Sequence, residues 1–234
     1  MKKYELTSET KVINGVELHR IKALKSFGNI KKGDLGGWIE SEKNLSQDGN
    51  AWVGGDATVC RNATISENAV VCDNAMVEEN AWIRGNARVI GYATVCGNAV
   101  VCDNATVEEN AWVRGHARVY GHSEVHGHAR VYGNAWVGGN AWVEDNVRIG
   151  DNATIEGNAT VRGKEDFIVF KNWWSSGRYF TWTRSNNKWK VGCFYGSGEE
   201  LIAKAYKDSE KSGREYERVV KYVESILKEE NNNK

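Results

Sequence analysis

Small and branched apolar residues alternate with polar ones in a strict six-residue rhythm from Asn50 to Gly163. Val or Ile recurs at every sixth position from 53 to 161, nineteen times without exception, and no residue is inserted or deleted. Ala lies two residues before each of these positions except at Ser123 and Val147. A fixed short period over such a length predicts a solenoid rather than a series of separate local elements.

Strand geometry explains the six-residue unit. Residues two apart on a strand point to the same side, so Ala and the following Val or Ile face inward while their neighbours face outward. Gly, Asp or Glu followed by Asn falls at each corner, and Gly and Asn adopt left-handed backbone angles at little cost. Three such sides close a triangular coil, so nineteen units predict about six coils in a rod roughly 30 Å long.

This pattern resembles the left-handed parallel β-helix of hexapeptide-repeat proteins. The resemblance covers about half of the chain, and it implies both the hand of the coil, which spacing alone does not set, and side-by-side homotrimers. We therefore expect a mainly β fold with three parts. Residues 1–49 form an N-terminal hairpin and capping coil, residues 50–163 the β-helix, and residues 164–234 a small α+β domain.

The segment before the repeats carries two structural signals. Asn14-Gly15 between alternating apolar runs predicts a β-hairpin with a type I′ turn. Ile39 and Leu45 are six residues apart but out of phase with Val53. We expect them to form an irregular first coil that caps the open end of the solenoid, because exposed strand edges invite end-to-end pairing.

The segment after the repeats predicts a small sheet followed by helices. Residues 164–196 have the pattern of three strands, with Asn186-Asn187 turning the second into the third. Residues 199–230 have apolar positions at helical spacing, with Ser197 as the cap of a first helix. Ser212-Gly213 is expected to separate this helix from a second one.

Composition and charge bear on the partners, location and cysteine chemistry expected of this protein. Thirty-one basic and thirty-one acidic residues cancel, so charge neither requires nor excludes a nucleic-acid partner. There is no long apolar run and no leader with a cleavage pattern, so we expect a cytoplasmic protein without a membrane partner. The five cysteines have neither a disulfide nor a zinc-site spacing, and we expect reduced thiols, no metal and no cofactor.

Tryptophans occupy outward strand positions of the repeats. Exposed single apolar residues are ordinary, but five tryptophans on one rod favour burial against something. The resemblance implies an interface between copies, and a foreign partner is the alternative, since Trp is a preferred anchor of interfaces. The predicted interface residues are Trp52, Trp82, Trp112, Trp136 and Trp142.

Histidines replace the corner Asn in three consecutive repeats, at His116, His122 and His128. Because the corners of one prism point apart, the three side chains cannot bind one metal ion together. Resemblance to hexapeptide acyltransferases implies an alternative, in which one of them is a general base between subunits and a coenzyme A thioester is the donor. Against this, no loop breaks the repeat to form an acceptor pocket. Repeat drift and a partner or metal contact remain open as well.

The region from Phe167 to Gly198 contains ten aromatic residues, five basic ones and no acidic one. Interleaved rings and cations are suited to base stacking and phosphate neutralisation, as in sites for a nucleotide or single-stranded nucleic acid. A small sheet also needs large rings for its own core. The predicted ligand or partner residues are Trp173, Trp174, Arg178, Tyr179, Arg184 and Lys188.

The order of a GDLGGWIESEKNLSQ leader, an NAxVxG array and an FTWTR…KVGCFYGSGEEL tail resembles proteins carried by phages and prophages of Gram-positive gut bacteria. This resemblance implies no reaction, but it does imply a role in blocking or sequestering a host component. Two hypotheses follow. The first is a non-catalytic, trimeric binding or scaffold protein that grips a host macromolecule or a nucleotide signal. The second is an acyltransferase that uses a repeat histidine.

Overall fold

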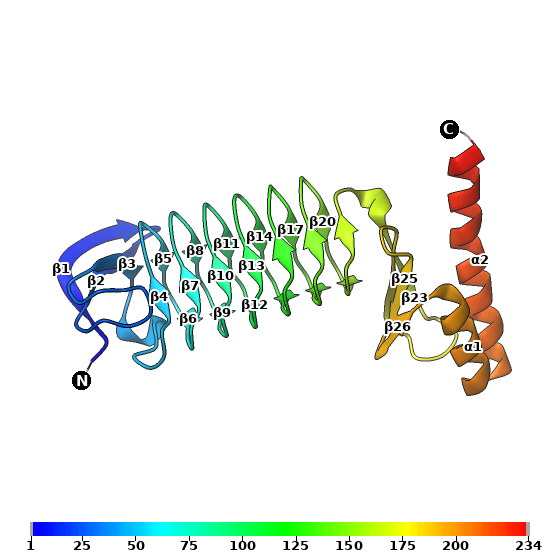
Figure 1. Cartoon of the computed structure of the whole chain (residues 1–234), viewed down its shortest axis with the longest axis horizontal. Helices are drawn as coiled ribbons and strands as arrows, with labels where there is room; N and C mark the ends of the chain where they lie inside the picture. The colour runs from blue at the N-terminus through cyan, green and yellow to red at the C-terminus, as the bar shows by residue number, and fades with distance from the viewer. Residues whose placement is uncertain (1, 233–234) are drawn as a thin grey trace. The chain divides into compact units, whose positions relative to one another are not determined.

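The computed structural model describes residues 2–232, which form two units with the boundary after Lys164 (Figure 1). The first unit contains the N-terminal hairpin and the solenoid, and the second contains a sheet and two helices. The N-terminal segment therefore belongs to the same unit as the repeats, and the predicted end of the repeats lies within one residue of the observed boundary. Among the described residues, no helix is both long and apolar enough to cross a membrane.

The repeats form nineteen two-residue strands, as the six-residue period predicts. Their bounds are β4 (Trp52–Val53), β5 (Thr58–Val59), β6 (Thr64–Ile65), β7 (Val70–Val71), β8 (Met76–Val77), β9 (Trp82–Ile83), β10 (Arg88–Val89), β11 (Thr94–Val95), β12 (Val100–Val101), β13 (Thr106–Val107), β14 (Trp112–Val113), β15 (Arg118–Val119), β16 (Glu124–Val125), β17 (Arg130–Val131), β18 (Trp136–Val137), β19 (Trp142–Val143), β20 (Arg148–Ile149), β21 (Thr154–Ile155) and β22 (Thr160–Val161).

Each repeat strand pairs in parallel with the strand one coil later, as Trp112 does with Arg130. Three sheets result, one for each side of the coil. The first side runs from β4 to β22, the second from β5 to β20 and the third from β6 to β21, each taking every third strand. The parallel β-helix is confirmed. It has about seven turns rather than six, because β3 (Leu35–Ile39) of the N-terminal segment joins the second side.

The inward columns form a dry core. Every repeat Val or Ile from Val53 to Val161 is fully buried, and so is every repeat Ala to within 1 %. Ser123, one of the two exceptions to the Ala rule, is also buried, and its hydroxyl donates to the Tyr120 carbonyl at 2.7 Å. The alternation of inward and outward positions predicted from the sequence is therefore confirmed along the whole solenoid.

The corners differ from the prediction in one respect. The residue before the corner Asn, and not the Asn itself, has the left-handed backbone, as at Arg61 (φ 58°) and Glu67 (φ 61°). The Asn side chains instead form ladders along the rod, with the Asn50 amide donating to Asn68 at 3.2 Å and Asn68 to Asn86 at 3.1 Å. These hydrogen bonds between successive coils explain the preference for Asn at this position.

Acidic residues at the left-handed positions are stabilised by the next coil. The Glu67 carboxylate accepts a hydrogen bond from the Gly85 amide at 2.9 Å, and the Glu109 carboxylate accepts one from the Gly127 amide at 2.7 Å. A left-handed conformation costs a residue with a Cβ about 1–2 kcal/mol. A charge-assisted hydrogen bond to a backbone amide offsets a cost of that size.

The chain enters the solenoid through a hairpin. Strands β1 (Tyr4–Ile13) and β2 (Val16–Ala23) pair antiparallel, and the turn between them has positive φ at Asn14 (50°) and Gly15 (77°), which confirms the predicted type I′ turn. Strand β2 then pairs with β3, which continues into the second side of the solenoid.

The first coil is two residues longer than the others. Ile39 of β3 lies opposite Val59, and Leu45 lies opposite Ile65, so both pairs are twenty residues apart instead of eighteen. The two extra residues lie between Leu45 and Val53, which are eight positions apart, whereas the short 3-10 helix η1 (Glu42–Asn44) lies between Ile39 and Leu45 at the ordinary spacing of six. This accounts for the phase shift seen in the sequence, and the irregular capping coil is confirmed.

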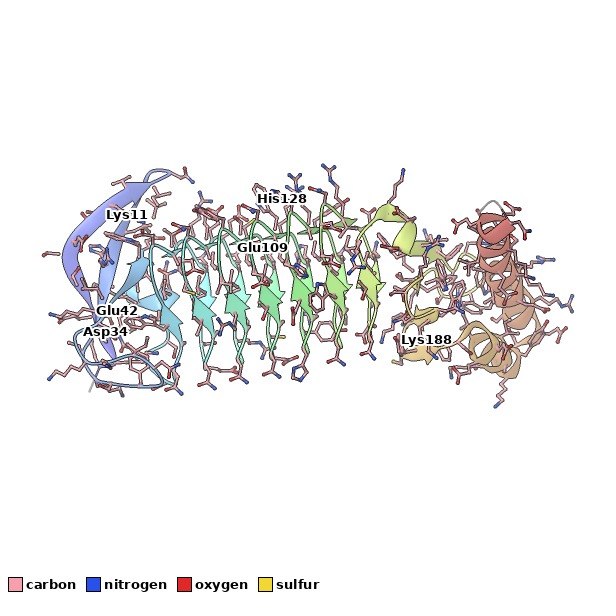
Figure 2. All side chains as sticks on the ribbon, turned by 45° about the horizontal axis from the view of Figure 1, so that its top comes forward. Lys11, Asp34, Glu42, Glu109, His128 and Lys188 are labelled. Carbon is pink, nitrogen blue, oxygen red and sulfur yellow. The ribbon has the colours of Figure 1, made fainter. Side chains whose placement is uncertain are left out.

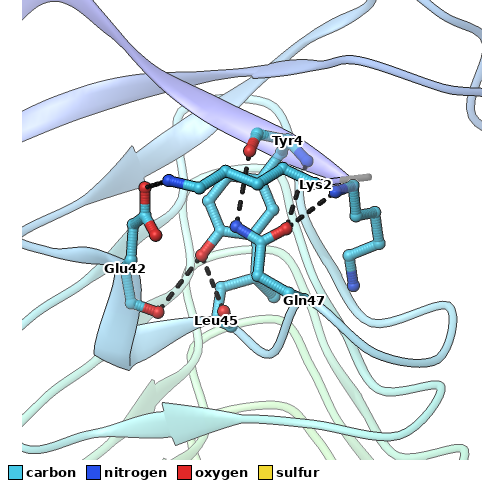
Figure 3. A network of polar contacts seen from close by, with 6 residues as sticks. Lys2, Tyr4, Glu42, Leu45 and Gln47 are labelled. Atoms are coloured by element: carbon cyan, nitrogen blue, oxygen red, sulfur yellow. Dashed lines mark hydrogen bonds and ion pairs between the residues drawn. The ribbon is translucent and has the colours of Figure 1, made fainter.

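A buried polar network fastens the hairpin to this first coil (Figure 3). The Tyr4 hydroxyl lies 2.6 Å from the Leu45 carbonyl and 3.2 Å from the Glu42 carbonyl, and the Gln47 side chain accepts from the Lys3 amide at 2.8 Å. Burial, and then the charge of Glu42, raises the pKa of Tyr4. The neutral hydroxyl is therefore the form that the folded state favours.

Replacing Tyr4 by Phe is expected to lower the free energy of unfolding by about 1–3 kcal/mol, because it leaves the buried carbonyl of Leu45 without its donor. A raised folded-state pKa means that the wild-type contribution is complete below about pH 10 and is lost as the pH rises above it. Urea unfolding at pH 7 and at pH 10.5 checks both points. Equal stability of the two proteins at pH 7 would contradict this role of the hydroxyl.

The cysteines are all unpaired. Burial is the main cause of a raised pKa at Cys60, to about 11, and of a smaller rise at Cys72, Cys96 and Cys102. Thiols with raised pKa values react slowly with oxidants and metals at neutral pH, since the thiolate is the reactive form. These four side chains therefore contribute to packing on the solenoid surface.

The second unit has one strand more than predicted. Its elements are η2 (Lys164–Asp166), which crosses the boundary, β23 (Phe167–Lys171), β24 (Tyr179–Thr183), β25 (Lys188–Val191), β26 (Phe194–Gly196), α1 (Gly198–Asp208) and α2 (Glu210–Asn232). The strands pair antiparallel in sequence order. The fourth strand follows a tight turn that contains Gly192 (φ 56°), and it is too short to be recognised from alternation.

The first helix begins where the sequence predicts, but the break between the two helices is at a different residue. The Ser197 hydroxyl accepts from the Glu200 amide at 3.2 Å, which confirms the cap of α1. The break between the helices is at Ser209, whose backbone is extended, and not at Ser212-Gly213. Gly213 is buried within α2, where a Cβ would lie 2.3 Å from the Tyr206 ring. This glycine therefore permits close packing of two helices rather than ending one.

Candidate functional site

The six side chains predicted to bind a ligand in the second unit do not form one group: Tyr179 and Lys188 are on the sheet, Arg184 follows β24, and Trp173, Trp174 and Arg178 are on the loop between β23 and β24. Phe180, Trp182 and Trp189 belong to the cluster that packs on α1 and α2. Because side chains alternate along a strand, the residues between these three point to the other face. The two helices cover only the first face (Figure 1).

Trp174 belongs to the core, so its prediction as a ligand residue is wrong. Its side chain is 8 % exposed, and its ring packs edge-on against Tyr216 of α2 at 5.0 Å and against Phe180 at 6.1 Å. A small sheet and two helices need large rings to form a core, and Trp174 supplies one of them.

Arg184 is also on the helix side. Its guanidinium forms an ion pair with Glu230 of α2 at 2.6 Å and lies over the Trp182 ring at 5.7 Å. The hydrogen bond to Glu230 is the main cause of a further rise in the pKa of Arg184. Arg184 therefore joins the sheet to α2, and its assignment to a ligand site is corrected to a structural role.

The sheet face turned away from the helices, here called the open face, combines cations with rings. Tyr179 and Lys188, both predicted from the sequence, are among its residues. Figure 2 labels Lys188 on this sheet. Alternation and strand pairing place on the open face the exposed Lys171, Tyr179 and Tyr195, the half-buried Phe167, Val169, Lys188 and Lys190, and the buried Thr181 and Thr183.

The charge of the open face is positive. No Asp or Glu occurs from Phe167 to Gly198, and none of the three lysines forms an ion pair within residues 2–232. Lys171 lies over the Tyr179 ring at 5.7 Å, and Lys190 is the strand partner of Tyr195. Lys188 is near Glu200 of α1, whose pKa is lowered by the Ser197 amide and then by this lysine. The unbalanced cations are therefore Lys171 and Lys190.

A loop closed by hydrogen bonds at one end of this face presents Trp173. The side chain of Asn172 is buried, donates to the Tyr216 hydroxyl at 3.0 Å and accepts from the Ser175 amide at 2.9 Å. The Gly177 amide closes the loop on the Asn172 carbonyl at 2.8 Å. Trp173 is 72 % exposed, so the loop holds a large ring in solvent, where a stacking partner can reach it.

Arg178, the last residue of this loop, reaches toward the turn between β25 and β26. Its guanidinium lies about 4 Å from the position of a Cβ at Gly192. Sequence reasoning did not assign Lys171, Lys190 or Tyr195 to the site. Alternation along β25 from the buried Trp189 would have placed Lys190 on this face, whereas Lys171 and Tyr195 join it through strand pairing with Tyr179 and Lys190.

The solenoid tryptophans do not form one row. Trp82 and Trp136 are on the third side, Trp112 is on the second, and Trp142 is on the first, all of them exposed. Trp52 is only 5 % exposed, because Phe27 packs on it at 5.5 Å and Gly36 lies against its ring. Its prediction as an interface residue is corrected: the N-terminal segment already covers it.

The three corner histidines are on three different edges, as their spacing predicts. His116 precedes a strand of the third side, His122 one of the first side and His128 one of the second. Figure 2 labels His128 on the solenoid surface. His122 continues an Asn ladder, with its Nε2 3.4 Å from the Asn104 amide nitrogen. Residues 2–232 contain no group of three or more His, Cys, Asp or Glu arranged to hold a metal.

Comparisons with protein-family models and with curated proteins find no match for this chain. The resemblances to phage proteins and to hexapeptide acyltransferases stay predictions for that reason. Acyl transfer by His116, His122 or His128 needs a second subunit to complete a pocket, since these three histidines lie on three different edges of one chain. It also stays a prediction. The open face, with Trp173 and Arg178 at its end, is the candidate site that the geometry supports best.

Proposed function

We propose that this chain is a non-catalytic binding protein and that the open face, with Trp173 and Arg178, binds a nucleotide-type ligand. The observation that carries the proposal is the placement of Lys171, Lys190, Tyr179 and Tyr195 on one face without a carboxylate among them. Phosphate groups bind to such cations, and bases stack on exposed rings regardless of their identity.

The surroundings support binding rather than catalysis. Among the titratable side chains of the open face and its loop, no histidine or carboxylate is present to act as a general base at neutral pH. The side chains sit on paired strands and on a loop fixed by buried hydrogen bonds, so little conformational entropy is lost when a ligand binds.

We propose further that the solenoid is the scaffold of this protein. Copies associate through its sides, as a trimer, and the chain acts in the bacterial cytoplasm. There it sequesters a nucleotide signal or blocks a nucleotide-bearing host component. These points are supported by the exposed tryptophans on the three sides and by the resemblance of the layout to phage-encoded proteins.

The test is a matched pair of double variants. Lys190→Ala with Tyr195→Ala removes one cation and one ring from the open face, and the loss of stacking alone is expected to weaken binding by about tenfold or more. Binding is measured by the fluorescence anisotropy of labelled oligothymidylate and by competition with ATP.

The control is Lys204→Ala with Tyr222→Ala, which removes the same two residue types from exposed positions on α1 and α2. It is expected to bind as the wild type does. Equal affinity of the wild type and the open-face variant, or an equal loss in the control, would refute the site.

A further inference from the structure

A second cationic cluster wraps one edge of the solenoid. In one coil, Arg114, His116 and Arg118 alternate with inward or corner residues from the end of β14 to the start of β15. We call this cluster, with the residues eighteen positions later, the arginine edge. Those later residues are Tyr132, Asn134 and Trp136.

The stacking of these two coils places each arginine over a ring. The guanidinium of Arg114 is 5.7 Å from the centre of the Tyr132 ring, and that of Arg118 is 5.3 Å from the Trp136 ring. A guanidinium held flat against an aromatic face keeps its in-plane N–H donors free, and its fork is pre-organised for the paired oxygens of a phosphoryl group.

Neither arginine is neutralised by this chain. Arg114 and Arg118 are exposed, and neither forms an ion pair within residues 2–232. Among the other solenoid arginines, Arg61 and Arg162 form ion pairs, and Arg130 lies over the Trp112 ring at 5.5 Å. Stacked arginines thus occur elsewhere, but within the described residues only this edge has one on either side of a single corner.

The corner residues of this edge also lack acid. Gly97, Gly115 and Gly133 occupy its left-handed positions in three successive coils, with φ between 66° and 74°. Glycine also takes the equivalent position at other corners, such as Gly121, Gly139 and Gly157, and on this edge the flanking acids are Glu79 and Asp151. At these glycines the position of a Cβ lies against the backbone of the next coil, as at Gly97, where it would be 2.7 Å from the Gly115 amide nitrogen, so glycine permits close stacking of the coils.

The surface here is hollowed. A recess with a volume of about 300 Å³ is lined by Asn98, Val100, His116, Arg118, Asn134 and Trp136. This is the lower end of the volume range of small-molecule sites. It combines one guanidinium, one imidazole and two amide side chains, all of which can donate hydrogen bonds to oxygen atoms.

We propose that the arginine edge binds the phosphoryl groups of a polyphosphate. A guanidinium group lies over each of the Tyr132 and Trp136 rings, so the paired cations, and not the rings, distinguish this edge from the open face. The guanidinium groups of Arg114 and Arg118 lie on either side of a corner, with His116 between them. This arrangement suits a chain of phosphates better than one isolated anion. The phosphates can belong to a free polyphosphate or to a nucleic-acid backbone.

The test is isothermal titration of the full chain with tripolyphosphate. The variant Arg114→Gln with Arg118→Gln retains side chains of similar reach without the charged forks, and it is expected to bind at least tenfold more weakly. The matched control is Arg84→Gln with Arg88→Gln, which changes two other exposed solenoid arginines. The control is expected to bind within about twofold of the wild type, and circular dichroism verifies that both variants are folded.

Oligothymidylate distinguishes the source of the phosphates. If it binds more tightly than tripolyphosphate and loses affinity in the Arg114/Arg118 variant, the ligand is a nucleic-acid backbone; if tripolyphosphate binds more tightly, it is a free polyphosphate. Both results support the arginine edge. Absence of binding to either probe, or an equal loss in the Arg84/Arg88 control, overturns it. The open-face variant at Lys190 and Tyr195 is expected to retain tripolyphosphate binding, so failure of one site is distinguishable from failure of the other.

Discussion

Replacing Val113 by Asp is expected to destabilise the solenoid strongly. Val113 has no exposed surface, and it lies in an inward column between Val95 and Val131 of the neighbouring coils. An unpaired buried charge costs about 3–5 kcal/mol or more, against a total stability of about 5–15 kcal/mol for a typical protein. The melting temperature, followed by circular dichroism, is expected to fall by about 10 °C or more.

The control for this change is Arg88→Asp, which introduces the same residue at an exposed, outward position of β10. Its effect on stability is expected to stay within about 1 kcal/mol, since surface substitutions are usually near neutral. If Val113→Asp melted like the wild type, the inward columns would be accessible to water and the triangular core described above would be wrong.

Replacing Trp174 by Ala is expected to destabilise the C-terminal unit by about 3–5 kcal/mol, the usual cost of removing a buried tryptophan. The change removes ring contacts with Tyr216 and Phe180 and opens a cavity between the loop and α2. Urea unfolding, followed by the near-ultraviolet circular dichroism of the aromatic cluster, measures the loss.

Trp173 provides the matched control, since it is the adjacent residue and is mostly exposed. Trp173→Ala is expected to change stability by less than about 0.5 kcal/mol and to weaken ligand binding instead. Similar destabilisation by the two substitutions would contradict the division of roles between these neighbouring tryptophans.

The solenoid could be predicted from the sequence because its core is local in the repeat. Each Val or Ile is followed six residues later by another that performs the same packing on the next side. Nothing distant in the chain is needed to decide which way these side chains point. The same holds for the turn at Asn14-Gly15, where residue type alone determines the backbone conformation.

Where distant segments meet, the sequence pattern failed. Trp52 occupies an outward slot identical to that of Trp82, yet Phe27 and Gly36 cover it, and neither shares the repeat. The prediction that Trp174 and Arg184 bind a ligand came from the local run of rings and cations. Such a run does not show on which side of the sheet each side chain lies. Their partners, Tyr216 and Glu230, belong to α2.

Spacing alone divides the tryptophans among the sides of the solenoid. Residues share a side of the solenoid only when their separation is a multiple of eighteen, so Trp112 cannot be on the side of Trp136. The five tryptophans therefore mark three different sides. An assembly of copies buries only those on the sides that meet, and the others stay exposed or bind a different partner.

Hydrogen–deuterium exchange of the full chain, with and without oligothymidylate, tests the central claim most directly. The predicted result is slower exchange in peptides from residues 167–196, which carry the open face and its loop, and unchanged exchange in α1 and α2. Unchanged exchange throughout residues 167–196 at saturating ligand, whatever occurs in the solenoid, would contradict the claim that this sheet is the binding surface.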